Sequence, residues 1–187
     1  MHYFTIYKSP IGIITLGSDG EKLIGLWNEN QKYHGSSIFT DMTDKDNLTV
    51  FNQTKKWLDR YFAEKKPEIS ELPLAPIGTA FRQKVWKLLC EIPYGDVVTY
   101  GDIASKLVLD SNDAHKYSRA VGGAVGHNPI SIIIPCHRVI GSDGSLTGYA
   151  GGVEKKIFLL ELEGAIAKLT GAHCRLRKKA MRIASPN

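Results

Sequence analysis

Short runs of β-branched and aromatic residues fill the first 28 positions of the chain and are separated by turn-forming sequences. The runs are Tyr3–Tyr7, Ile11–Leu16 and Lys22–Trp27. Ser9-Pro10-Ile11-Gly12 separates the first two, and Ser18-Asp19-Gly20 precedes the third. Such runs with turn residues between them are typical of antiparallel strands. The pattern therefore predicts a small β-meander at the N-terminus.

The apolar spacing then changes to that of helices. Most apolar residues between Val50 and Phe62 fit one helical face, whereas residues 29–48 are polar and predict a loop. The clearest helix comes later, with apolar residues at i, i+4, i+7, i+8 and i+11 from Phe81. Thr79 is its expected N-cap and Pro93 its end.

Two shorter helices are expected next, one capped by Thr99 and running to Leu107, the other at about Tyr117–Val125. Two short helices across a turn form a candidate helix-turn-helix, although many proteins that do not bind DNA also contain such a pair. The β-branched run Ile130–Ile134 predicts a buried strand. A glycine-rich loop at 141–152 and a helix from Val153 to about Glu163 complete the pattern.

A proline-rich segment at 65–80 indicates a linker with a boundary near 70–77. We therefore expect an N-terminal domain at 1–75, a C-terminal domain at 76–165, and a basic tail at 166–187. The fold class is α/β in the α+β sense, with a small N-terminal β-sheet plus helix and a mostly helical C-terminal domain.

Composition narrows the function classes. The net charge of +5 and the pI of about 9.0 permit a polyanionic partner. No apolar run approaches the roughly 20 residues of a membrane span, and the N-terminus lacks the layout of a secretion signal. We expect a cytoplasmic protein, or a nuclear one if the source has a nucleus, with no membrane partner.

The chain has three cysteines, and no pair has C-x-x-C spacing. This argues against a disulfide framework or a structural zinc site, so no metal or cofactor is expected. Cys136 is distinctive because it follows the predicted buried strand and precedes His137 and the glycine loop. A nucleophilic cysteine needs thiolate character, which a base gives it by taking the thiol proton, and His137 is the candidate base. A bridging water is expected between the side chains of Cys136 and His137. An inert core cysteine is the alternative interpretation. Similarly, Glu163 is either an acid that orients His137 or a solvated residue at a helix end.

Several motifs occur in a familiar order. They are Pro93–Ala104, Arg119–Ala124, Asn128-Pro129, Ile134-Pro135-Cys136-His137-Arg138-Val139, Gly148–Gly152 and Leu159–Gly164. Together they resemble the O6-alkylguanine-DNA alkyltransferases over about 79–164, and the first seventy residues resemble the N-terminal domain of the bacterial members. The resemblance implies a winged-helix-like helix-turn-helix in the C-terminal domain. It also implies DNA repair, in which a guanine O6-alkyl group, and an O4-alkyl group of thymine as well, is transferred irreversibly to Cys136 after base flipping.

The resemblance assigns roles residue by residue. Cys136 is the acceptor thiol, His137 takes its proton through a water, and Glu163 orients His137. Asn128 ties the two helices together, and Tyr100 donates to guanine N3. The residues assigned to catalysis are therefore Cys136, His137, Glu163, Asn128 and Tyr100.

Two further sets follow from the resemblance. Arg119 replaces the extruded base within the helix, and the backbone at Val139 and Ala150 contacts the flipped guanine. Many relatives have serine at the position of Ala150. The DNA-binding set is Arg119, Tyr100, Gly101, Ala120, Gly122, Gly123, Arg138 and Ser142. The substrate-pocket set is Val139, Tyr149, Ala150, Ser131 and Thr147.

The implied partner is double-stranded DNA containing O6-alkylguanine, bound in the minor groove without sequence preference by a monomer. Two further features depart from the family pattern: the turn near 108–117 is longer than expected, and the basic tail after Gly164 has no recognised counterpart. Three alternatives remain. They are a non-catalytic sensor of alkylated DNA, whose known members lack the cysteine, a helix-turn-helix regulator, and a cysteine hydrolase that turns over.

Overall fold

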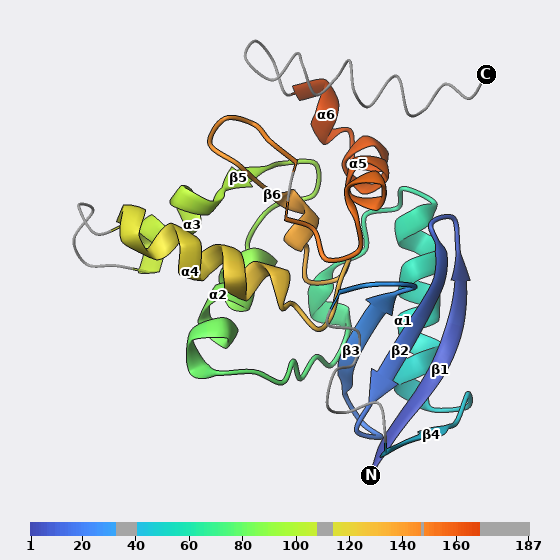
Figure 1. Cartoon of the computed structure of the whole chain (residues 1–187). Coiled ribbons are helices and arrows are strands. Elements are labelled where there is room, and N and C mark those ends of the chain that lie inside the picture. Colours follow the sequence, from blue (N-terminus) through green and yellow to red (C-terminus); the bar gives the residue numbers. More distant parts are fainter. Residues whose placement is uncertain (33–40, 108–113, 147, 169–187) are drawn as a thin grey trace.

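The structure is a computed structural model that describes residues 1–32, 41–107, 114–146 and 148–168. Its N-terminal half is a four-stranded sheet of order β3-β2-β1-β4 with the helix α1 against it (Figure 1). The elements of this half are β1 (His2–Ser9), β2 (Gly12–Ser18), β3 (Leu23–Asn28), β4 (Met42–Asp44), α1 (Thr49–Phe62) and the 3₁₀ helix η2 (Ile69–Glu71).

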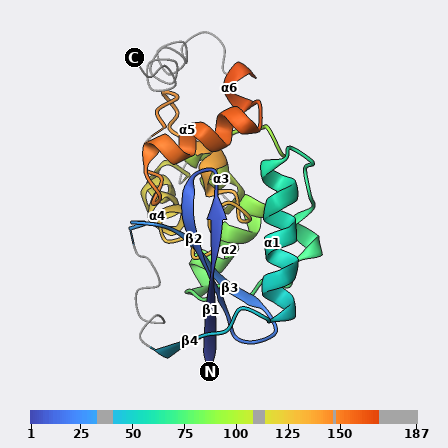
Figure 2. The same ribbon diagram turned by 90° about the vertical axis from the view of Figure 1, so that its right-hand side faces the viewer.

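The predicted β-meander is present as β1, β2 and β3, which pair antiparallel in sequence order. Helix α1 lies along one face of the sheet, as Figure 2 shows with the sheet nearly edge-on. Its buried residues recur at helical spacing from Val50 to Tyr61, which explains why this segment forms an amphipathic helix. The prediction that 29–48 is loop is wrong at β4, which pairs in parallel with β1. The polar composition concealed β4 because it is a largely exposed edge strand.

The C-terminal half is mostly helical. Its elements are α2 (Ala80–Cys90), β5 (Val98–Thr99), α3 (Tyr100–Leu107), α4 (Ala114–Gly126), the 3₁₀ helix η4 (Cys136–Arg138), β6 (Val139–Ile140), α5 (Val153–Leu162) and α6 (Ala165–Lys168). Helix α2 begins at its predicted cap, because the Thr79 hydroxyl accepts from the amide of Arg82 at 3.3 Å. The expected pair of short helices is present as α3 and α4, which pack against each other, and α4 begins earlier than predicted.

The predicted strand at Ile130–Ile134 is wrong. Only Ile130 pairs, as an isolated bridge, and the next residues form a buried turn in which Ile132 has a φ of 71°. The Asn128 side chain closes this turn by accepting from the amide of Ile130 at 3.1 Å and donating to the carbonyl of Ile134 at 2.8 Å. A β-branched run indicated burial correctly, but a side-chain amide here satisfies the backbone groups that a neighbouring strand would otherwise pair.

Strand β3 joins the two halves. Its outer edge pairs in parallel with Leu74 of the linker and with Ile130, so both segments extend the N-terminal sheet. The amide of Leu26 donates to Pro129 at 2.8 Å, and the amide of Ser131 donates to Leu26 at 3.0 Å. A single cluster of buried apolar residues includes members from both halves. The turn that carries the candidate nucleophile is therefore held by the N-terminal sheet.

Helix α5 ends before Gly164, whose φ of 71° favours glycine. The chain then forms α6, in which Ala165 and Ile166 are buried, so the first residues of the expected tail belong to the packed structure. Residues 169–187, which hold most of that tail, lie outside the described part of the chain. No helix among the described residues is both long and apolar enough to cross a membrane.

Candidate active site

Cys136 begins the 3₁₀ helix η4 directly after the Asn128-supported turn. Its side chain is buried, with 4% of the residue exposed. Burial raises the pKa of the thiol, and the nearby side chains of Asn128 and Lys156 act in the opposite direction. Burial therefore dominates and favours the protonated thiol, while the two neighbouring groups partly offset it in favour of the thiolate.

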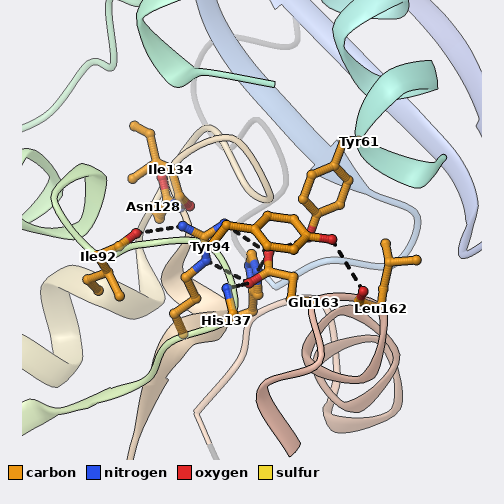
Figure 3. A network of polar contacts seen from close by, with 10 residues as sticks. Tyr61, Ile92, Tyr94, Asn128, Ile134, His137, Leu162 and Glu163 are labelled. Atoms are coloured by element: carbon orange, nitrogen blue, oxygen red, sulfur yellow. Dashed lines mark hydrogen bonds and ion pairs between the residues drawn. The ribbon is translucent and has the colours of Figure 1, made fainter. Parts of the chain in front are cut away.

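His137, the next residue in the sequence, is fully buried. Its Nε2 lies 2.8 Å from Oε1 of Glu163 (Figure 3). A carboxylate oxygen accepts hydrogen bonds, so Nε2 carries the proton and Nδ1 has a free lone pair. Nδ1 is buried and has no hydrogen-bond partner among the described residues. Burial lowers the pKa of His137, although Glu163 opposes the shift, so the imidazole is neutral and able to accept a proton.

Glu163 accepts hydrogen bonds from four residues. Besides His137, Tyr61 donates its hydroxyl at 2.7 Å, Arg138 donates from Nε and Nη2 at 2.8 and 2.9 Å, and Gly95 donates its amide at 3.2 Å. Burial alone would raise the pKa of Glu163, but the contacts to His137 and Arg138 outweigh it and lower that pKa. Glu163 is therefore an anion whose two oxygens are both engaged (Figure 3).

The structure contradicts the prediction that Arg138 contacts DNA. Arg138 is 6% exposed, and its Nη1 donates to the carbonyl of Ile92 at 2.6 Å. Its guanidinium also lies 5.6 Å from the centre of the Tyr94 ring. A guanidinium that is buried and paired with Glu163 has no free face for a phosphate. Its contacts balance the buried carboxylate instead.

Lys156 is a residue at the site that the sequence analysis missed. It is fully buried in α5, and its ammonium donates to the carbonyl of Val139 at 2.6 Å. Burial lowers its pKa to about 8, and a negative charge on Cys136 acts in the opposite direction. The available signal was its place on the same helical stripe as Leu159 and Glu163, three and seven residues further on. A lysine on a buried stripe indicates a buried partner.

Parallel pairing of β5 with β6 brings Tyr100 to the acceptor turn, since Thr99 pairs with Ile140. The Tyr100 side chain is partly buried, and burial raises the pKa of its hydroxyl. A negative charge on nearby Cys136 raises that pKa further. The Tyr100 hydroxyl also lies against Gly148, where a β-carbon would come within 2.6 Å of it. Tyr100, Gly148 and Cys136 therefore belong to one neighbourhood, although 48 positions separate the first two.

The outer face of α4 borders two hollows. One, of about 730 Å³, is lined by five residues of the predicted DNA-binding set: Tyr100, Gly101, Arg119, Gly122 and Ser142. The other, of about 380 Å³, is lined by Gly122, Gly123, Tyr149 and Ala150, among others. Arg119, Ala120 and Gly123 are exposed, and beyond the adjoining residues and backbone of α4 no described atom lies within 4 Å of the place where a β-carbon on Gly123 would sit. This face carries small side chains beside one arginine.

The substrate-pocket set is placed only in part. Ser131 and Tyr149 are buried, and the ring centres of Tyr149 and His137 are 6.5 Å apart. The carbonyl of Val139 accepts from Lys156, and that of Ala150 accepts from the amide of Lys32 at 3.0 Å. Thr147 and most of the long turn at 108–117 lie outside the described residues.

Comparison with known proteins decides the family. The 6-O-methylguanine DNA methyltransferase DNA binding domain matches residues 80–165, and the ribonuclease-like domain of the same proteins matches residues 2–76. The methylated-DNA–protein-cysteine methyltransferase of Haemophilus influenzae is 45% identical over 161 residues, covering 86% of each chain. The chain belongs to the methylated-DNA–protein-cysteine methyltransferase family.

Other methylated-DNA–protein-cysteine methyltransferases agree with this assignment. The protein of that name from Methanosarcina acetivorans is 44% identical over 163 residues, covering 87% of this chain and 99% of the relative. Solved structures agree as well. The Mycobacterium tuberculosis OGT in complex with DNA superposes with a TM-score of 0.76 at 42% identity, covering 87% of this chain and 93% of that one. The expected fold class is confirmed by this similarity.

Proposed function

We propose that this chain repairs alkylated DNA by accepting an alkyl group from the O6 of guanine, and from the O4 of thymine, onto Cys136. The thiolate sulfur attacks the alkyl carbon, a carbon–sulfur bond forms, and the bond from carbon to oxygen breaks with its electron pair left on the base. Tyr100 donates a hydrogen bond to guanine N3 and stabilises the base as that charge develops. The product is a thioether, which does not hydrolyse as a thioester does, so each protein molecule acts once.

The observation that carries this proposal is the orientation of His137. Glu163 accepts a hydrogen bond from Nε2–H of His137 at 2.8 Å, so Nδ1 is left as a buried acceptor on the residue next to the acceptor cysteine. A water held between Nδ1 and the sulfur would pass the thiol proton to the imidazole. The buried ammonium of Lys156 adds a positive charge that favours the thiolate.

Helix α4 is the proposed DNA-binding element. Its exposed face carries Arg119 beside small residues, which allows a helix to approach a groove closely. Because guanine O6 lies within the base stack, the base must leave the duplex, and Arg119 would fill the vacated space. Few polar side chains on this face can read bases, so we propose minor-groove binding without sequence preference by a monomer. Such a protein works where the DNA lies, in the cytoplasm or, in a nucleated cell, the nucleus.

Intact-protein and peptide mass spectrometry tests the proposal after mixing with a duplex that carries one O6-methylguanine. We expect a one-to-one methyl adduct on the Cys136 peptide, and none in Cys136→Ala. Cys90→Ala is the matched control and should keep the adduct, because Cys90 ends α2 and has no adjacent histidine to take its proton, whereas Cys136 is followed by His137. Damage-selective binding with no adduct would instead indicate a sensor, and repeated turnover would indicate a hydrolase.

A further inference from the structure

A buried polar cluster connects the N-terminal sheet to the acceptor pocket. It contains Asn28 at the end of β3, Gln31 in the following turn, and Ser131 and Tyr149 from the C-terminal half. Asn28 is fully buried, Gln31 is 5% exposed and Ser131 is 1% exposed. None of the roles assigned above uses Asn28 or Gln31.

The turn fixes the Gln31 side chain. The backbone amide of Gln31 donates to the backbone carbonyl of Asn28 at 3.0 Å. The side-chain Oε1 of Gln31 accepts from the backbone amide of Asn28, also at 3.0 Å. A backbone amide can only donate, so the atom facing Asn28 must be the oxygen of the Gln31 side chain. The Nδ2 of Asn28 donates to the same oxygen at 3.2 Å.

This assignment determines the direction of the Ser131 hydroxyl. Ser131 Oγ lies 3.0 Å from Gln31 Oε1, which accepts only, so Ser131 must donate its single proton to Gln31. The lone pairs of Ser131 are then left for the acceptor pocket, where its hydroxyl lies near Cys136 and Tyr149. Gln31 therefore sets the hydrogen-bonding character of one pocket wall.

The same turn also holds the loop that carries Tyr149 and Ala150. The amide of Lys32 donates to the carbonyl of Ala150 at 3.0 Å, and Asn28 Nδ2 lies 3.5 Å from the Tyr149 hydroxyl. The fit is close, because a β-carbon on Gly151 would lie 2.9 Å from Asn28 Nδ2. Lys155 fastens the start of α5 by donating to the carbonyl of Glu29 at 3.1 Å.

This polar cluster costs more free energy than apolar packing would, so packing of the two halves alone does not explain it. The Oδ1 of Asn28 is buried and has no hydrogen-bond partner among the described residues. Apolar side chains of similar volume would fill this interface without leaving such an atom.

We propose that Gln31 is a positioning residue of the acceptor pocket, which acts on alkyl transfer by fixing the Ser131 hydroxyl and, through Asn28, the Tyr149 loop. The inference rests on the proposed alkyl transfer to Cys136. It assigns to the N-terminal half an indirect part in the chemical step. Gln31 itself touches neither the sulfur nor the base.

The test compares variants by the single-turnover rate of methyl transfer at saturating duplex and, separately, by affinity for duplex DNA. Gln31→Met keeps the side-chain volume but removes the acceptor, and we expect transfer to slow about tenfold with DNA affinity unchanged. Gln31→Glu keeps an acceptor for the three donors, which are the backbone amide and Nδ2 of Asn28 and the Ser131 hydroxyl. It should therefore retain most of the wild-type transfer rate. Gln53→Met is the matched control, because Gln53 is exposed on α1, and it should behave as wild type.

A double-mutant cycle separates positioning from general loosening of the fold. If Gln31 acts partly through Ser131, then Gln31→Met should slow transfer clearly less in a Ser131→Ala background than in the wild type, and the remaining loss measures the route through Asn28 to the Tyr149 loop. A wild-type rate in Gln31→Met, or the same loss in both backgrounds, would overturn the proposal. Should Gln31→Met not fold, Ser131→Ala removes the same hydrogen bond from the other side, and a wild-type rate there also overturns it. Failure of the wild-type protein to form any adduct contradicts the proposed function itself and is seen before a variant is compared.

Discussion

Substitution of Glu163 by glutamine probes the most heavily hydrogen-bonded carboxylate of the site. Every group around it is a donor: His137, Tyr61, Arg138 and the amide of Gly95. Glutamine offers one acceptor oxygen and replaces the other with an NH₂ group, which has no acceptor to face there. The substitution also leaves the buried guanidinium of Arg138 without its counter-charge.

The size of the effect follows from these contacts. Removing one partner of a buried ion pair costs about 3–5 kcal/mol, and glutamine retains an acceptor for some of the donors, so we expect about 3 kcal/mol. For a chain of this size, each kcal/mol lowers Tm by about 2–4 °C, which gives a fall of roughly 6–12 °C. Glu161→Gln is the matched control, since Glu161 is exposed on the same helix, and it should change stability by less than about 0.5 kcal/mol.

The assay is urea unfolding of the wild type and both variants at pH 7.5 and at pH 3.5. The pKa of Glu163 is lower in the folded chain than its ordinary value of 4.5. Its stabilisation is therefore complete above about pH 4.5 and declines as the pH falls further. The gap between wild type and Glu163→Gln should accordingly narrow at pH 3.5. An equal gap at both pH values, or stability within about 0.5 kcal/mol of wild type at pH 7.5, would refute this account of the network.

Three other substitutions probe separate features. Lys156→Met should raise the pKa of the Cys136 thiol, because it removes a nearby cation, and the pH dependence of iodoacetamide labelling measures this; an unchanged profile would contradict it. Gly25→Ala should lower the free energy of unfolding in urea by about 1–3 kcal/mol, because its β-carbon would lie 1.9 Å from the buried Trp27 ring; wild-type stability would show that the ring can move aside. Gly123→Ala should raise stability by up to about 1 kcal/mol, since the site is helical and open, yet weaken duplex binding in an anisotropy titration; unchanged binding would place the DNA elsewhere.

Local patterns predicted the helices well, because each depends on spacing within one segment. The caps at Thr79 and Thr99 and the buried face of α1 are examples. The contact between His137 and Glu163 was implied by the family motifs and is present at 2.8 Å. The catalytic role of that contact remains a prediction.

The errors and omissions concern contacts between distant segments. The Ile130–Ile134 run forms a turn because the Asn128 side chain satisfies its backbone, which apolar periodicity cannot indicate. Tyr61 reaches Glu163 across 102 positions, and Gln31 reaches Ser131 across 100. The resemblance placed Arg138 in the DNA-binding set, but its pairing with Glu163 became visible only in three dimensions.

The outer edge of β3 has a consequence for how the chain is made. Every residue of this strand is buried in the finished protein, and its outer edge is covered by Leu74 and Ile130, which leave the ribosome after it. Until they arrive, the nascent sheet exposes an apolar strand with unpaired backbone groups, the kind of edge that pairs with other chains. A fragment that stops before Leu74 should therefore aggregate, and the N-terminal sheet completes its folding only once much of the catalytic half has been synthesised.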